Sequence, residues 1–318
     1  MLNASPPRLS DALVPLRDEI ERALRRASTS LPVGVAAVAH VGVTLAARAL
    51  VVDVAQPEVL ARLDHDIAHA SRRWTQRPTH IEPARDGPVL SAVVTRARRT
   101  RSPALLRSWQ QGVRSLAHYI DGAPQSGDPG DALGWALWGL GCAGVTTRAR
   151  RIDKCVERLR SRQADAGCWG DPTRGYLATT SVVALGLEGV AVPSHQPFLG
   201  IAMDWLAMCQ NEDGGFGERT PTHEGPAAGG VGPSQIGATA IVLACLSGSA
   251  TRYRGACLDA IRWLLAQQTD DGSWPVADRG ALAVIALTRC AKTEPLTRFP
   301  HSLLTRSTPP ITPTKKKR

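Results

Sequence analysis

Gln268-Thr-Asp-Asp-Gly272-Ser-Trp274 carries the pattern that decides the fold: a glutamine, then a glycine, then an aromatic ring at fixed spacing. Two earlier stretches repeat this spacing, Gln163-Ala-Asp-Ala-Gly167-Cys-Trp169 and Gln210-Asn-Glu-Asp-Gly214-Gly-Phe216. Each copy follows a helix-period stretch, so each marks the exit of a helix into a turn. A stop signal that recurs roughly every 50 residues indicates stacked helix pairs rather than one irregular globule.

The second half of the chain divides into three predicted helix pairs. In each pair the first helix is nearly all apolar and the second is amphipathic. The predicted ranges are 131–142 with 148–162, 177–187 with 198–209, and 234–246 with 254–267. This asymmetry suits an inner ring of buried helices surrounded by an outer ring. Strand signals are scarce because the apolar runs are Ala/Leu/Gly-rich and helically spaced, so we predict an all-α fold.

The first half of the chain is also predicted to be helical, over residues 9–27, 35–52, 57–74 and 89–98. Between the last two ranges, residues 76–88 contain prolines and a glycine, which predicts a loop. The apolar stretch 31–52 approaches membrane-spanning length, but it contains His40 and Arg48. A charged residue near a bilayer centre is costly, so a buried helix is favoured.

Composition limits the partners that the chain can have. It has 318 residues, 43% of them hydrophobic and 21% charged, as expected of a soluble globular protein. The net charge of +10 is dispersed and no zinc spacing accompanies it, so we expect no nucleic-acid partner. The seven cysteines contain no CxxC pair, which indicates buried thiols in a reducing compartment and no metal site. The N-terminus lacks a secretion signal, so we expect a cytoplasmic protein that could contact a membrane peripherally.

Taken together, these stretches resemble the C-terminal part of the squalene-hopene cyclase family of class II terpene cyclases, whose QW repeats have the form Q-x3-G-x-W. The segments Asp131-Ala-Leu-Gly-Trp-Ala-Leu, Pro233-Ser-Gln235 and Arg298-Phe-Pro300 also match, and the resemblance covers residues 128–305. It implies an α/α toroid of six inner and six outer helices, present once where full-length cyclases have two. We expect residues 103–305 to form this toroid, residues 1–102 to complete or flank it, and residues 306–318 to form a disordered basic tail.

The repeat has a physical rationale of its own. A glutamine side chain can donate and accept hydrogen bonds at once, so it can satisfy carbonyls at a helix end and an amide on the adjoining helix. The aromatic ring would then pack over this junction. We therefore interpret the motif mainly as a structural staple.

Class II cyclases protonate an alkene, which requires a carboxylic acid held in its protonated form. The family carries this acid in an Asp-x-Asp-Asp motif upstream of the repeats, and this sequence has no such motif. Asp66, in Asp64-His-Asp-Ile67, could take the acid's role, or it could belong to a solvated i,i+4 charge pattern. Asp131 matches a family aspartate that lines the lower cavity, or it could be a helix N-terminal acid favoured by the dipole. Both are candidate catalytic residues.

The resemblance also suggests substrate-binding rings. Trp135 replaces a histidine that supports the acid in the family, and Trp169 is similar to a repeat position close to the cavity. Tyr176 completes the predicted set. Carbocations are stabilised by π-faces, yet only 4% of the residues are aromatic. The family's aromatic-rich stretch after the last repeat is replaced by residues 275–287, so we do not expect a large polycyclisation cavity.

Three functions remain open from the sequence. The leading hypothesis is a terpenoid cyclase-like protein that binds an isoprenoid in an apolar toroid and acts by proton-initiated cyclisation or isomerisation, without a cofactor or a metal. The alternative is a non-catalytic lipid-binding or interaction module that assists another terpene enzyme. A prenyltransferase β-like subunit is a third reading, but we find no arrangement of Asp, Cys and His for its zinc site.

Overall fold

The computed structural model describes residues 9–30, 41–51, 57–76, 80–123, 130–147, 149–170, 175–192, 196–218, 232–275 and 277–291. Within these ranges the chain forms α-helices and one 3₁₀ turn, and no strand. The helices are α1 (Leu9–Ser30), α2 (Val41–Val51), α3 (Pro57–Ser71), α4 (Arg73–Gln76), α5 (Pro83–Thr100), α6 (Pro103–Gly122), α7 (Asp131–Cys142), α8 (Arg150–Arg160), α9 (Tyr176–Gly189), α10 (Pro197–Met208), α11 (Ile236–Leu246), α12 (Arg254–Ala266) and α13 (Ala277–Ala291).

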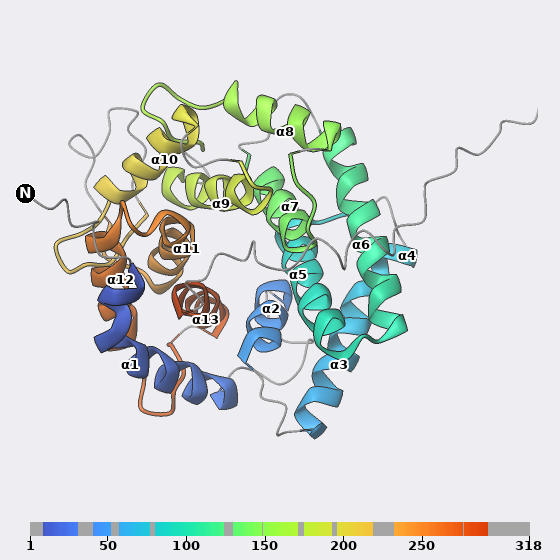
Figure 1. Ribbon diagram of the computed structural model, residues 1–318, viewed down its shortest axis with the longest axis horizontal. Coiled ribbons are helices and arrows are strands. Elements are labelled where there is room, and N and C mark those ends of the chain that lie inside the picture. The colour runs from blue at the N-terminus through green and yellow to red at the C-terminus, as the bar shows by residue number, and fades with distance from the viewer. Residues whose placement is uncertain are drawn as a thin grey trace, which may run out of the picture.

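Six of these helices form a closed inner ring. In order around the ring they are α2, α5, α7, α9, α11 and α13, and α13 packs back against α2 (Figure 1). The helices α1, α3, α6, α8, α10 and α12 lie outside them, with the short α4 between α3 and α6. This arrangement confirms the predicted all-α toroid, and the helices before residue 103 belong to the same two rings.

Neighbouring inner helices run in the same direction. Gly42 of α2 meets Arg85 of α5 near the N-terminal ends of both helices, and Gly141 of α7 meets Gly189 of α9 near their C-terminal ends. The ring therefore has an N-terminal end and a C-terminal end. The six inner helices surround a common axis, and we call the region along this axis the lumen.

Glycines bring the inner helices into backbone contact. A Cβ added at Gly134 of α7 would lie 2.7 Å from the carbonyl oxygen of Val182 in α9. Gly87 of α5 faces the carbonyl of Trp135 in α7 in the same way. Real Cβ atoms do not approach a backbone this closely, so only glycine allows this helix spacing. The inner helices α5, α7 and α9 are consequently held in direct backbone contact.

Each glutamine of the repeat joins its own turn to the next outer helix. The Nε2 atom of Gln163 donates to the carbonyl of Gly167 at 2.7 Å and to that of Phe198, at the start of α10, at 2.7 Å. Gln210 donates likewise to Gly214 and to Ala256 of α12, both at 2.9 Å. The staple role is thus supported, but the partner on the adjoining helix is a carbonyl in each case, whereas the sequence suggested an amide.

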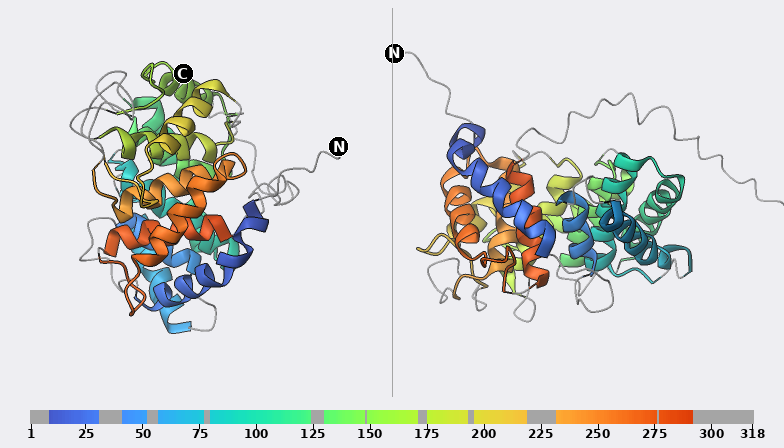
Figure 2. Two further views of the ribbon diagram at one scale, coloured as in Figure 1. Left: turned by 90° about the vertical axis from the view of Figure 1, so that its left-hand side faces the viewer. Right: turned by 90° about the horizontal axis from the view of Figure 1, so that it is seen from below.

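The third copy closes the ring between the two ends of the described chain. Gln268 Nε2 donates to Gly272 O at 2.9 Å and to Ala23 O of α1 at 3.0 Å. Arg26 of α1 donates in turn to Gln268 Oε1 at 2.7 Å. In Figure 2 the N-terminal helix lies along the α12 side of the molecule, where these contacts are made.

Three expectations for the elements need correction or fall outside the structure. The loop predicted over 76–88 is wrong at its end, because α5 begins at Pro83 and carries Pro88 inside it. Pro83 fits the start of a helix because the N–H groups of the first turn lack helical partners. The stretch 275–287, read only as poor in rings, forms most of the inner helix α13. The predicted tail 306–318 lies outside the described residues.

Candidate active site in the toroid lumen

One face of α7 carries four residues along the lumen: Asp131, Trp135, Trp138 and Cys142. Their spacing of four, three and four residues places them on a single helical face. The stripe runs about 17 Å from the N-terminal end of the ring to its C-terminal end, at 1.5 Å per residue. We refer to it as the α7 stripe.

The contacts of α7 on its other faces show that this stripe faces inward. The carbonyl of Trp135 meets Gly87 of α5 on one side, and Gly134 meets Val182 of α9 on the other. The opposite face carries Leu133, Leu137 and Leu140, which are fully buried beneath the outer helices. Asp131 and Trp135 are only half-buried. Because α5 and α9 flank the stripe and the leucines occupy the outer side of α7, the stripe faces the lumen, with Trp138 buried on it.

Asp131 is the first residue of α7 and follows Gly130, whose φ is 100°. A left-handed backbone at this point turns the chain sharply into the helix, and glycine adopts it without strain. The carboxyl of Asp131 therefore sits at the N-terminal end of the ring, on the stripe that also carries Trp135. The structure thus brings together one of the predicted acids and one of the predicted rings.

Two tryptophans follow Asp131 along the stripe. The rings of Trp135 and Trp138 pack edge to face, with 5.6 Å between their centroids and 73° between their planes. Edge-to-face packing fixes both rings and leaves a π-face available to a neighbour. Trp138 did not appear among the predicted site residues, although its spacing from Trp135 is the signal that would have found it.

Trp169 lies between the outer helix α8 and the inner helix α9. Its indole Nε1 donates to the carbonyl of Leu159 in α8 at 2.7 Å, and its backbone N–H donates to Thr180 Oγ1 of α9 at 2.9 Å. Tyr176 is 4% exposed. It lies four residues before Thr180 on α9, so Tyr176 and Thr180 share the face of α9 that meets the first repeat. Both hydrogen bonds of Trp169 thus go to α8 and α9 and not to α7, which carries Trp135.

Asp66 is also distant from the α7 stripe. It lies on the outer helix α3 and is 3% exposed, which corrects the reading of a solvated charge pattern. Its carboxylate contacts Arg48 of α2 at 3.4 Å and Arg62 at 3.4 Å. The Arg48 side chain is itself buried, and burial lowers its pKa. The ion pair between Asp66 and Arg48 thus joins the outer helix α3 to the inner helix α2. The structure does not bring Asp66 to Asp131.

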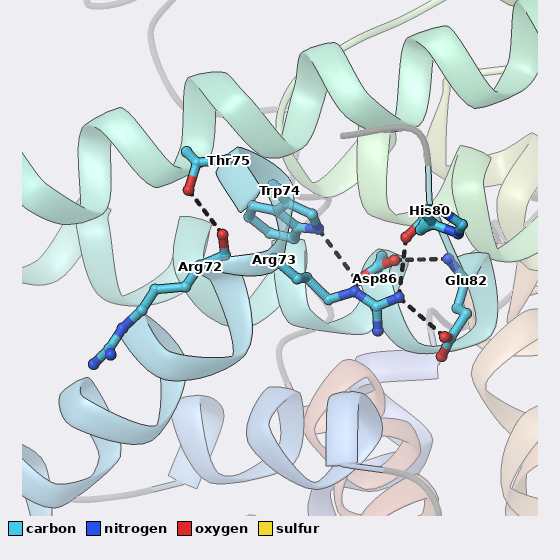
Figure 3. A network of polar contacts seen from close by, with 7 residues as sticks. All are labelled: Arg72, Arg73, Trp74, Thr75, His80, Glu82 and Asp86. Atoms are coloured by element: carbon cyan, nitrogen blue, oxygen red, sulfur yellow. Dashed lines mark hydrogen bonds and ion pairs between the residues drawn. The ribbon is translucent and has the colours of Figure 1, made fainter. Parts of the chain in front are cut away.

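A further buried carboxylate, Asp86, was missed because its segment was read as a loop. It is 0% exposed in the first turns of α5. Trp74 Nε1 donates to it at 3.2 Å and the backbone N–H of Glu82 donates at 2.8 Å, as Figure 3 shows. Arg73 lies 3.8 Å away and also bonds Glu82 at 3.0 Å. Burial raises the pKa of Asp86. These partners tie α4 to the start of α5.

The repeat region, which carries the α7 stripe, is similar to known proteins. Residues 128–281 match the family model of the squalene-hopene cyclase C-terminal domain. The relationship predicted from the QW repeats is therefore confirmed. The match includes the α7 stripe and all three repeats, and it begins after α3 and α5, which carry Asp66 and Asp86.

Individual relatives agree with this family match over part of the chain. The squalene-hopene cyclase of Bradyrhizobium diazoefficiens is 28% identical over 172 residues, which are 51% of this chain and 26% of the relative. Drimenyl diphosphate synthase from Streptomyces showdoensis is 31% identical over 123 residues, 38% of this chain and 21% of that enzyme. The chain spans about a quarter of the length of the curated relatives it matches.

Solved structures support the fold over nearly the whole chain. A variant of the type II terpene cyclase MstE from Scytonema, in complex with its substrate geranylgeranyl dihydroxybenzoate, superposes with a TM-score of 0.58 at 16% identity, covering 87% of this chain and 99% of MstE. Likeness at this identity shows the fold alone. Within the described residues, no helix is both long and apolar enough to cross a membrane.

Proposed function

We propose that the protein binds an isoprenoid chain along the α7 stripe and acts on it as a terpenoid cyclase or isomerase. The observation that carries this proposal is the coincidence of a half-buried carboxyl, Asp131, with the rings of Trp135 and Trp138 on one lumen-facing stripe. Apolar inner helices around this stripe suit a hydrocarbon chain. The family match of residues 128–281 supports the same class of ligand.

In the proposed reaction Asp131 is the proton donor. The carboxylic acid of Asp131 transfers its proton to one carbon of an alkene, and the C=C π electrons form the new C–H bond. The O–H bond breaks, which leaves a carbocation on the other carbon and a carboxylate on Asp131. The π electrons of a second alkene then form the new ring bond. Loss of a proton to a base restores a C=C bond and ends the reaction. Trp135 and Trp138 would stabilise the cation through their ring quadrupoles.

The roles of Asp66 and Asp86 favour the alternative, a non-catalytic isoprenoid-binding module. Asp66 and Asp86, the buried carboxylates that precede the repeats, both have structural partners. If neither can donate a proton, the chain could keep the toroid as an isoprenoid-binding module. Asp131 then remains a helix N-terminal acid.

A product assay separates the two. Purified protein is incubated with squalene, farnesyl diphosphate or geranylgeranyl diphosphate, and extracts are searched for cyclised products. We expect product with the wild type and with Asp153→Asn, which changes an exposed first-turn acid on the outer helix α8. Asp131→Asn should abolish it. Asp66→Asn should lower stability but leave the chemistry. Isoprenoid binding without product from any of these substrates would leave only the non-catalytic alternative.

A further inference from the structure

The C-terminal end of the lumen holds a charged pair that the α7 stripe does not explain. Arg289 of α13 bonds Glu188 of α9, with 2.8 Å between Nη2 and Oε2. These two helices are not neighbours in the ring, because α11 lies between them. The pair therefore passes across the end of α11, where Ser247 Oγ lies 3.5 Å from Arg289 Nε.

The position of Glu188 depends on a glycine at the end of α11. A Cβ at Gly248 would overlap the Glu188 carboxylate, so a side chain there would displace it. The Glu188 and Arg289 side chains remain 18% and 21% exposed. That exposure is enough for a ligand atom to reach both groups. Burial raises the pKa of Glu188 despite its arginine partner.

Arg289 shares its end of the ring with Cys142, the last residue of the α7 stripe, which lies on the helix opposite α13. Burial raises the pKa of the Cys142 thiol. Because Arg289 and its partner Glu188 lie in the last turns of α13 and α9, the pair lies at the C-terminal end of the ring, remote from Asp131.

The charges at this end of the ring are unbalanced. The C-terminal halves of the six inner helices, within the bounds given above, contain five arginines and one acidic residue. The arginines are at positions 48, 96, 98, 99 and 289, and the acidic residue is Glu188. Arg48 and Arg96 pair with Asp66 and Asp64 of α3. Three arginines and one carboxylate remain, and of these arginines only Arg289 contacts Glu188, whereas Arg98 lies over the Trp109 ring of the outer helix α6. Arg98 and Arg99 bond the C-terminal carbonyls of Cys142 and Leu50, which leaves Arg289 with a displaceable partner.

We propose that Arg289 anchors an anionic head group, a carboxylate or a phosphate, on the isoprenoid that occupies the lumen, and that Glu188 holds this arginine in place until the ligand arrives. This inference rests on the proposed isoprenoid binding. Arginine suits the role because its planar guanidinium binds two-oxygen acceptors in a fixed geometry. The chain of the ligand would then extend along Trp138 and Trp135 toward Asp131.

Binding of three ligands tests this anchor: geranylgeraniol, geranylgeranoic acid and geranylgeranyl phosphate. We expect the wild type to bind both anions about tenfold more tightly than the neutral alcohol. Arg289→Gln should remove this preference without weakening alcohol binding. Glu188→Gln should strengthen anion binding, because it frees Arg289 of its competitor. Arg252→Gln, which breaks the exposed pair between Arg252, in the turn before α12, and Asp204 of the outer helix α10, is the matched control and should change nothing.

The double variant Arg289→Gln/Glu188→Gln guards against misfolding, since a lone Glu188 is costly at a partly buried site. It should fold, bind the alcohol normally and show no anion preference. Normal alcohol binding with no anion preference in the wild type, or equal losses in Arg289→Gln and Arg252→Gln, would overturn the anchor alone. Failure of the wild type to bind any of the three ligands would overturn the proposed function and the anchor together.

Discussion

Gln268 and Ala23, from opposite ends of the described chain, are joined by a hydrogen bond of 3.0 Å. This bond repeats the geometry by which Gln163 and Gln210 each hold the next outer helix. The helix α1 therefore occupies the place that a following repeat would fill. In a toroid closed in this way the first and last helices stabilise each other, because neither can bury its apolar face alone.

Replacing Gln268 with alanine should loosen this closure. The change removes two donated bonds and one accepted bond, and we expect a loss of about 1 kcal/mol for each bond in the free energy of unfolding. Hydrogen exchange should become faster in α1. The neighbouring Gln267 is exposed, so Gln267→Ala is the matched control. Equal exchange rates in the two variants would mean that the third repeat does not close the ring.

Adding one methyl group between inner helices should be costly. Gly134→Ala would drive a Cβ toward Val182 O, and separating α7 from α9 should cost about 1–3 kcal/mol in chemical denaturation. Gly255 in α12 has open space around its missing Cβ. Gly255→Ala should therefore be tolerated and should not lower stability, since Gly255 is the second residue of α12 and its added Cβ meets no neighbour. A neutral Gly134→Ala would contradict the close backbone contact.

The indole N–H of Trp169 should contribute to stability separately from its ring. Trp169→Phe keeps an aromatic group but leaves the Leu159 carbonyl at the end of α8 without its 2.7 Å donor. We expect a loss of about 1–3 kcal/mol from this buried acceptor. Trp274 makes the same contact with Leu264 O at 3.0 Å, so Trp274→Phe should behave alike. If isoprenoid binding falls while stability is unchanged, Trp169 belongs to the ligand site instead.

Asp86 should give stability a definite dependence on pH. Burial raises its pKa in the folded state, so folded protein holds this proton at pH values where unfolded protein has lost it. Stability from this group is full below the ordinary aspartate pKa and falls as pH rises through the folded pKa. The difference in unfolding free energy between wild type and Asp86→Asn should therefore shrink with rising pH. A difference that grows would mean that Arg73 and the two donated hydrogen bonds outweigh burial.

The sequence predicted the fold well because the repeat combines local signals. Gln210, Gly214 and Phe216 lie within one turn, and their contacts depend on helix ends that periodicity locates. The lumen was harder to predict, since Arg289 meets Glu188 only after the ring closes. Asp86 was missed for a local reason: Pro83 and Pro88 suggested a loop, whereas Pro83 starts a helix. Asp131 and Trp135 were predicted from the family resemblance, and the structure places both on one face of α7.

Photo-crosslinking tests most directly whether an isoprenoid occupies the lumen. A geranylgeranyl analogue with a diazirine near its middle is irradiated with the protein, and labelled residues are located by mass spectrometry. Attachment on the α7 stripe, at Trp135 or Trp138, blocked by excess geranylgeraniol, is the expected result. Labelling confined to exposed residues of the outer helices, such as Ile201 and Met208 of α10, would contradict a lumen site.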